Sequence, residues 1–192
     1  MAETIVKTKV RDREGRKRFL ACVLLFFLFS FLGWCLEKLF FYFSYGASVD
    51  RGFLTLPFCT VYGSSLLIVR AICGIPLKKS SPYPSNLLRL LAYAALSALI
   101  ATAAELVTGL FFENVFHVRL WSYRGYAHEF AGYICLSMSI GWGFMIAAAM
   151  ALFWAPLERI LMKAPVSALG WGSAFLTVAI SLDFVLTALS CL

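Results

Sequence analysis

Five apolar segments, each about as long as a helix that crosses a lipid bilayer, constrain this chain more than any other feature. Such a helix needs about 20 apolar residues, and 61% of the 192 residues here are hydrophobic while 14% are charged. A soluble domain averages about 25% charged residues. The composition therefore predicts an all-α integral membrane protein, folded as a compact bundle of about five transmembrane helices. The predicted spans cover residues 19–43, 55–77, 87–112, 132–155 and 167–190.

The chain divides into a basic tail and a single polytopic membrane domain. The tail, residues 1–18, holds seven of the 17 basic residues, and residues 19–192 carry the spans and their connectors. The first apolar run is longer than the hydrophobic region of a signal peptide and lacks a small-residue cleavage site, so we expect it to be retained. The second span includes Pro57 and Gly63, and a partly re-entrant segment packed within protein is its alternative.

The distribution of basic residues predicts how the chain is oriented in the membrane. With the N-terminus inside, the inner segments hold twelve Lys and Arg residues, and the outer loops hold only Arg51, Arg119 and Arg124. Because basic residues are enriched on the cytoplasmic side, we expect a multi-pass protein of the cell membrane with a cytoplasmic N-terminus and an extracytoplasmic C-terminus. The net charge of +7 is explained as an orientation signal, and no nucleic-acid partner is expected.

Glu37 and Glu105 are acidic residues that fall inside predicted spans, toward their outer ends. A charge at the bilayer centre costs about 2.5–3.5 kcal/mol on insertion scales, so such residues usually face the bundle interior and have a partner. Helical spacing places Glu37 on one face with Trp34 and Phe41, and it places Glu105 on a stripe of small residues that includes Ala98. Both acids are therefore predicted to face other helices.

Two acids at similar depth need a cation, a shared proton or an arginine as their partner. We therefore predict an outward-facing polar pocket in which these acids meet aromatic side chains and arginines of the outer loops. The candidate substrate-binding or ion-pair residues are Glu37, Arg51, Tyr62, Glu105, Glu113, Arg119, Trp121, Tyr123 and Arg124. The same residues can instead form a Glu–Arg network that only holds helices and loops together. Asp183, on the last predicted span, has no evident partner in the sequence; it can join that pocket or mark a contact with another protomer or subunit.

Patterns that would indicate catalysis or a bound metal are weak in this chain. It carries no G-x-S-x-G element, no convincing Cys–His pair and no Gly-rich phosphate loop. His117 and His128 are spaced too loosely to suggest a metal site. We therefore expect no enzymatic activity, no catalytic residues, no metal and no cofactor. If the protein uses ATP, the ATPase must be another chain.

Four sequence elements carry a family resemblance when they are taken together and in order. They are "FLGWCLEKLF", "VDRGFLTLPFCTVYG", "AAELVTGLFFENVFHVRLWSY" and "FAGYICLSMSIGWG", and as a set they are far more specific than any one of them alone. With these elements the chain resembles the bacterial CmpB family of ABC-transporter type IV membrane proteins. The family's motif positions in this sequence are Glu37, Arg51, Gly52, Pro57, Tyr62, Gly63, Glu105, Glu113, Trp121, Tyr123 and Trp142. Ser122 departs from the pattern, because the family usually has an Asp there.

The resemblance implies a membrane transport component, a permease-like subunit that can require a separate ATPase subunit. The alternative is a structural or regulatory membrane protein, whose basic tail binds anionic lipid or a cytoplasmic partner. An intramembrane enzyme that uses a glutamate as general acid or base ranks last, because no nucleophile or metal set accompanies the acids. We expect the protein to be embedded in the lipid bilayer. A separate ATPase subunit and a second copy of the chain are its candidate protein partners.

Overall fold

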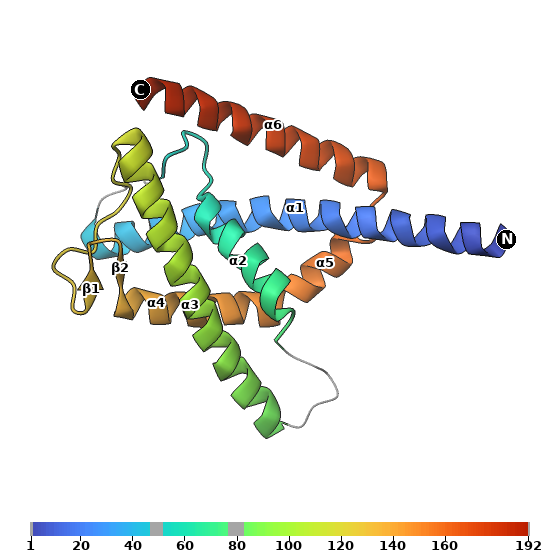
Figure 1. The fold of residues 1–192 in the computed structure, drawn as a ribbon, viewed down its shortest axis with the longest axis horizontal. Helices are drawn as coiled ribbons and strands as arrows, with labels where there is room; N and C mark the ends of the chain where they lie inside the picture. The colour runs from blue at the N-terminus through green and yellow to red at the C-terminus, as the bar shows by residue number, and fades with distance from the viewer. Residues whose placement is uncertain (1, 47–51, 77–82, 192) are drawn as a thin grey trace.

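The computed structural model describes residues 2–46, 52–76 and 83–191. Helices account for most of these residues, and one short antiparallel pair of strands is found among them. Figure 1 shows the helices in one assembly, with the two termini at opposite ends. The elements are α1 (Ala2–Tyr45), α2 (Thr60–Cys73), α3 (Tyr83–Phe116), β1 (Glu129–Phe130), β2 (Ile134–Cys135), α4 (Leu136–Ala148), the π-helical η1 (Ala149–Trp154), α5 (Ala155–Leu161) and α6 (Val166–Cys191). The predicted all-α membrane fold is confirmed.

Four helical stretches of the described chain are long and apolar enough to cross a membrane. They are Arg11–Phe43, Asn86–Phe116, Leu136–Leu161 and Val166–Cys191. The predicted second span covers residues 55–77, and of its described residues, 55–76, only the 14 of α2 are helical. A helix of that length rises about 21 Å, less than the hydrocarbon thickness of about 30 Å. Whether α2 crosses the bilayer fully or enters it as a re-entrant piece stays a prediction, as does the exact number of spans.

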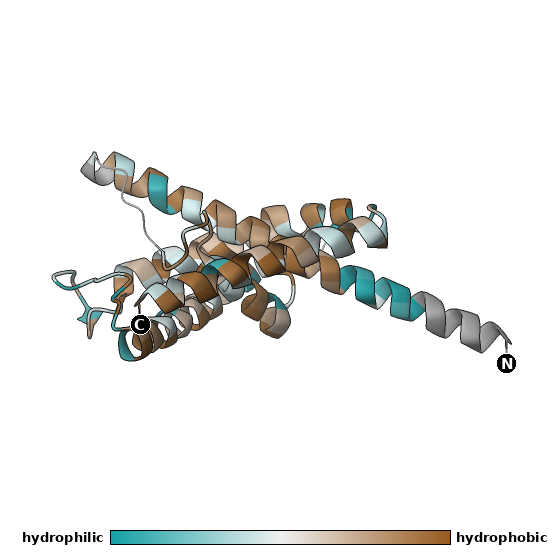
Figure 2. Ribbon diagram, turned by 90° about the horizontal axis from the view of Figure 1, so that it is seen from above, coloured by the Kyte–Doolittle hydropathy of each residue, from teal (hydrophilic) through white to brown (hydrophobic). Residues whose placement is uncertain are grey.

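Helix α1 changes character along its length. Its first part carries the basic tail, and from Phe19 onward it is almost continuously apolar. Figure 2 shows this change as a hydrophilic stretch of α1 that extends beyond the other helices and then gives way to hydrophobic residues inside the assembly. The apolar part of α1 therefore packs with the other helices, while the basic part projects from them.

Neighbouring helices are brought together at positions with small side chains. Gly63 of α2 lies against the backbone of Phe26 and the hydroxyl of Ser30 in α1, where any larger side chain would collide. Gly143 of α4 lies in the same way against Ala94 and Ala98 of α3. Small residues let helix backbones approach closely, which is how transmembrane helices gain van der Waals contact without a hydrophobic driving force. The stripe of small residues on the third predicted span is thus a packing surface.

The core lies where α1, α2, α3, α4 and η1 cross. Trp154 of η1 is fully buried and stacks on Phe29 of α1 with the ring planes 4° apart and the centroids 5.9 Å apart. Leu25, Val69 and Met150 are also fully buried and belong to the same cluster. Helix α6 packs along α1, where the Ser173 hydroxyl donates a hydrogen bond of 3.3 Å to the carbonyl of Leu20.

The helix of the fourth predicted span, Leu136–Leu161, continues beyond the predicted end at residue 155 through a widened turn. Pro156 is the second residue after the π-helical segment η1, and α5 continues past it to Leu161. A proline inside a helix removes one backbone donor and crowds the carbonyl four residues earlier. A π-helical turn gives the chain room to pass such a residue without ending the helix.

Candidate functional site

A cavity of about 680 Å³ lies between α1, α2, α3, α4, η1 and α6, which is within the usual size of small-molecule sites of about 300–1,000 Å³. The segments at residues 52–59 and 120–123 contribute the rest of its wall. Most of its lining is apolar or aromatic. Its lining residues include Phe29, Leu32, Leu36, Glu37, Phe53, Phe58, Cys59, Tyr62, Ser65, Glu105, Thr108, Phe112, Trp121, Tyr123, Trp142, Met145, Phe153, Ser181 and Phe184.

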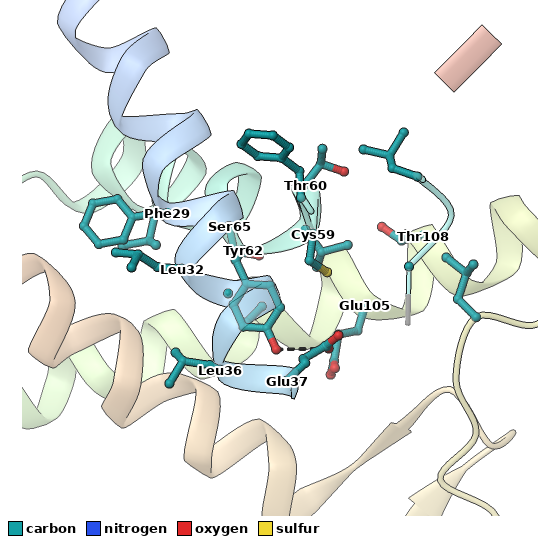
Figure 3. A pocket seen from close by; sticks show the side chains of 18 of the residues that line it. Phe29, Leu32, Leu36, Glu37, Cys59, Thr60, Tyr62, Ser65, Glu105 and Thr108 are labelled. Atoms are coloured by element: carbon teal, nitrogen blue, oxygen red, sulfur yellow. Dashed lines mark hydrogen bonds between the residues drawn. The ribbon is translucent and has the colours of Figure 1, made fainter. Parts of the chain in front are cut away.

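Glu37 reaches this cavity from α1 and is held by a residue of α2. The Tyr62 hydroxyl donates a hydrogen bond of 3.1 Å to Oε1 of Glu37. Gly33 lies one helical turn earlier on α1, directly against the Tyr62 ring, so a side chain there would displace that ring. Figure 3 shows Glu37, Tyr62 and Glu105 gathered at one end of the pocket.

Glu105 enters the cavity from α3 and is only 6% exposed. Its Oε1 accepts two hydrogen bonds, one of 3.0 Å from the Tyr123 hydroxyl and one of 2.9 Å from Nε1 of Trp142. Its Oε2 is buried and has no hydrogen-bond partner among the described residues. Burial, and next the neighbouring Glu105 carboxylate, raise the pKa of Tyr123, so this phenol stays protonated and remains a donor.

Two aromatic rings connect the two acids. The rings of Tyr62 and Trp142 meet edge to face with centroids 5.1 Å apart. Because Tyr62 donates to Glu37 and Trp142 donates to Glu105, the four side chains form one continuous group across α1, α2, α3 and α4. Edge-to-face contacts of this kind contribute about 0.5–1.5 kcal/mol beyond the area they bury.

Glu113 and Arg119 form a second cluster, beyond the cavity. Arg119 donates two hydrogen bonds to the Glu113 carboxylate, of 2.6 Å and 3.1 Å, and the Tyr133 hydroxyl donates a third, of 3.0 Å. The Arg119 guanidinium also lies over the Tyr133 ring, 4.7 Å from its centroid. The nearby Trp121 donates its indole N–H to the carbonyl of Tyr133. These contacts tie the segment after α3 to the turn before β2.

The predicted site residues therefore separate into groups. Glu37, Tyr62, Glu105, Trp121 and Tyr123 line the cavity together. Glu113 and Arg119 pair with each other outside its described lining. Arg124 lies beside Gly132 in the loop region, also outside that lining. Arg51 falls outside the described residues.

Asp183 has partners that the sequence did not reveal. It is buried at 8% exposure on α6, and its carboxylate accepts hydrogen bonds from the Thr55 hydroxyl and, at 3.0 Å, from the backbone N–H of Leu56. Nearby, the rings of Phe53 and Phe184 lie 5.3 Å apart. Asp183 thus fastens α6 to the non-helical segment before α2, at the edge of the cavity.

Trp142 and Tyr133 are the residues of these clusters that the pocket prediction omitted. Trp142 appeared only as a position of the family motif, and its role as a donor to Glu105 required the structure. Tyr133 carries no signal beyond being a tyrosine near a predicted helix start. In both cases the partner is distant in sequence, 37 residues for Trp142 with Glu105 and 20 residues for Tyr133 with Glu113.

Comparison with known proteins gives the same family as the four sequence elements that carry the resemblance. A family model described as "Putative ABC-transporter type IV" matches residues 24–188, which include two of the four long apolar stretches completely, most of the other two, and all of the cavity lining. No curated protein and no solved structure matches the chain. The chain is a multi-pass, all-α membrane protein, and it belongs to the ABC-transporter type IV family of CmpB proteins.

Proposed function

We propose that the protein is a permease-like transport component and that the cavity around Glu37 and Glu105 receives the transported solute. The observation that carries this proposal is the cavity itself. It is of ligand size, it lies within a helical membrane assembly, and most of its wall is apolar with a few polar groups at one end. Binding sites for small molecules share this composition.

The proposal includes a separate ATPase subunit as the source of energy. The chain has no G-x-x-x-x-G-K-[ST] element with which to bind ATP, and the family name links it to ABC transporters. The proposal contains no catalytic step; the hydrogen bonds described for Glu37 and Glu105 come from phenol and indole donors. We also keep the prediction that the cavity opens toward the outer side of the membrane.

A substitution that fills the cavity tests the transport role. Ser181 lines the cavity from α6 and is exposed, so Ser181→Trp can place an indole there without disturbing the core. Uptake of a panel of labelled organic solutes is measured in proteoliposomes that contain the purified protein and, where a neighbouring gene encodes one, its ATPase. We expect flux of the transported solute to fall at least about tenfold with Ser181→Trp, because indole and solute compete for the same volume.

Leu182→Trp is the matched control. Leu182 follows Ser181 on the same helix, is 57% exposed and is not part of the described cavity lining. The same bulky residue there should leave flux unchanged. Equal flux through both variants and the unmodified protein would contradict the transport role of the cavity.

The second candidate function is a structural or regulatory membrane protein, and one set of contacts favours it. Glu113, Arg119 and Tyr133 form a hydrogen-bonded cluster whose evident effect is to hold a loop. Glu105 also binds a loop residue, Tyr123. If this candidate is right, substitutions in both clusters lower stability in detergent while no solute is transported by any form of the protein.

A further inference from the structure

Both charged side chains that line the cavity are acidic. Glu37 and Glu105 are accompanied by apolar, aromatic and neutral polar residues, and the described lining contains no Lys, Arg or His. A hollow lined by charge of one sign and bounded by low-dielectric walls concentrates the electric field and attracts ions of the opposite sign. The charge of the described lining therefore favours a positively charged ligand.

Glu105 holds an unused acceptor at this position. Glu105 is buried, with 6% of the residue exposed, and both of its protein donors bind the same carboxylate oxygen, Oε1. Oε2 is left without a hydrogen-bond partner among the described residues. A buried carboxylate oxygen that lacks a partner is unfavourable, whereas a cation nearby would offset the loss of water.

The walls of the cavity indicate what kind of cation fits. Hard metal ions such as Ca²⁺ need six or more oxygen ligands, and the cavity lining supplies mainly carbon atoms and aromatic rings. Rings such as those of Trp121, Tyr123 and Trp142 attract a cation through their π faces. The cavity volume of about 680 Å³ also far exceeds the volume of a single metal ion.

We propose that the cavity binds an organic cation with an apolar body, whose positive group lies near Glu105 and whose apolar part lies against the aromatic walls. This inference rests on the proposed function, because it names the class of solute for the same cavity. It makes Glu105 both a structural acceptor, through Oε1, and a ligand-binding residue, through Oε2. Glu37, which accepts a hydrogen bond from Tyr62, lines the same cavity from α1.

Two ions of the same shape and opposite charge test the inference. Binding of tetraphenylphosphonium and of tetraphenylborate to the purified full-length protein is measured by equilibrium dialysis, with protein-free micelles as the background. We expect saturable binding of the phosphonium and none of the borate. Glu105→Gln should raise the phosphonium Kd about tenfold or more, because it removes the charge that attracts the cation. The glutamine oxygen can still accept from Tyr123 and Trp142, so the fold is retained.

Glu158→Gln is the matched control for this experiment. Glu158 lies on α5, where it accepts a hydrogen bond from Trp154, and it is not part of the described cavity lining. The substitution removes one acidic charge from the protein but none from the cavity, so the phosphonium Kd should stay unchanged. A melting curve for each variant confirms that the protein compared is folded.

Three results would overturn the inference: absence of phosphonium binding, equal binding of the borate, or an unchanged Kd in Glu105→Gln. The transport role fails by a different measurement. Phosphonium binding together with flux that is indifferent to Ser181→Trp would support the ligand class and contradict transport. If Ser181→Trp lowers flux but the transported solute is neutral or anionic, the result would support transport and contradict the ligand class.

Discussion

Glu105 combines two physical roles at the scale of a single residue. Its Oε1 is the common acceptor for a loop phenol and a helix indole, Tyr123 and Trp142. Both donors lie in a largely buried region, where an N–H or O–H without an acceptor costs about as much as a lost hydrogen bond. The negative charge of the carboxylate is a separate property. Substitutions that remove the acceptor and substitutions that remove only the charge should therefore have different effects.

Comparing Glu105→Ala with Glu105→Gln separates these two roles. We expect Glu105→Ala to lower the free energy of unfolding by about 1–3 kcal/mol, because Tyr123 and Trp142 each lose their acceptor. Glu105→Gln keeps an acceptor oxygen and should cost less. The measurement is unfolding in mixed micelles by titration with sodium dodecyl sulfate. If the two variants were equally stable, the hydrogen bonds to Oε1 would not contribute to folding.

At the scale of the secondary-structure element, the packing of helix pairs depends on glycines at defined positions. Gly143 and Gly141 lie two residues apart on α4. A side chain at Gly143 would meet the carbonyl of Ala94 and the side chain of Ala98, whereas a side chain at Gly141 meets nothing within 4 Å. The same replacement at the two positions therefore distinguishes helix packing from the helix propensity of glycine.

Gly143→Ala is predicted to weaken the contact between α3 and α4. Overpacking a close contact costs about 1–3 kcal/mol, and here the colliding atom is backbone, which cannot rotate away. Gly141→Ala should be neutral or slightly stabilising, because alanine favours a helix by about 1 kcal/mol over glycine. Thermal unfolding of both variants in detergent measures the difference. A larger loss from Gly141→Ala would show that the α3–α4 contact is not the tight one.

Five crossings and an extracytoplasmic C-terminus remain predictions at the scale of the whole molecule. In Figure 1 α1 and α6 run toward the same end of the protein, and the combined helix α4–η1–α5 runs the other way. An odd number of crossings therefore depends on α2, the shortest of the five. The location of the C-terminus relative to the membrane reports directly on whether α2 crosses.

Cys191 provides a natural label for that location. It is exposed near the end of α6, and a variant in which the other five cysteines are replaced by serine or alanine leaves it as the single thiol. We expect a membrane-impermeant maleimide to label this variant in intact cells, because the basic tail should keep the N-terminus inside. The opposite control is a variant whose single cysteine replaces Ala2, with Cys191 removed as well. This cysteine should react only after lysis. Labelling of Cys191 only after lysis would indicate an even number of crossings.

Sequence alone determined the class of fold, the approximate places of the long helices and the two acids that need partners. It could do so because the cost of exposing charge or backbone to lipid is large and acts locally, so apolar length and buried charge are visible in the chain itself. Five of the nine predicted site residues then met at one cavity: Glu37, Tyr62, Glu105, Trp121 and Tyr123.

Only the tertiary structure decided which partner each acid has. Arg119 pairs with Glu113, Glu105 is bonded to Tyr123 and Trp142, and Asp183 holds the segment before α2. These pairings depend on how far each helix is rotated and where each loop folds back. Rotation and loop position follow from close packing over residues far apart in the chain, such as the 127 residues between Leu56 and Asp183, and no local pattern records them.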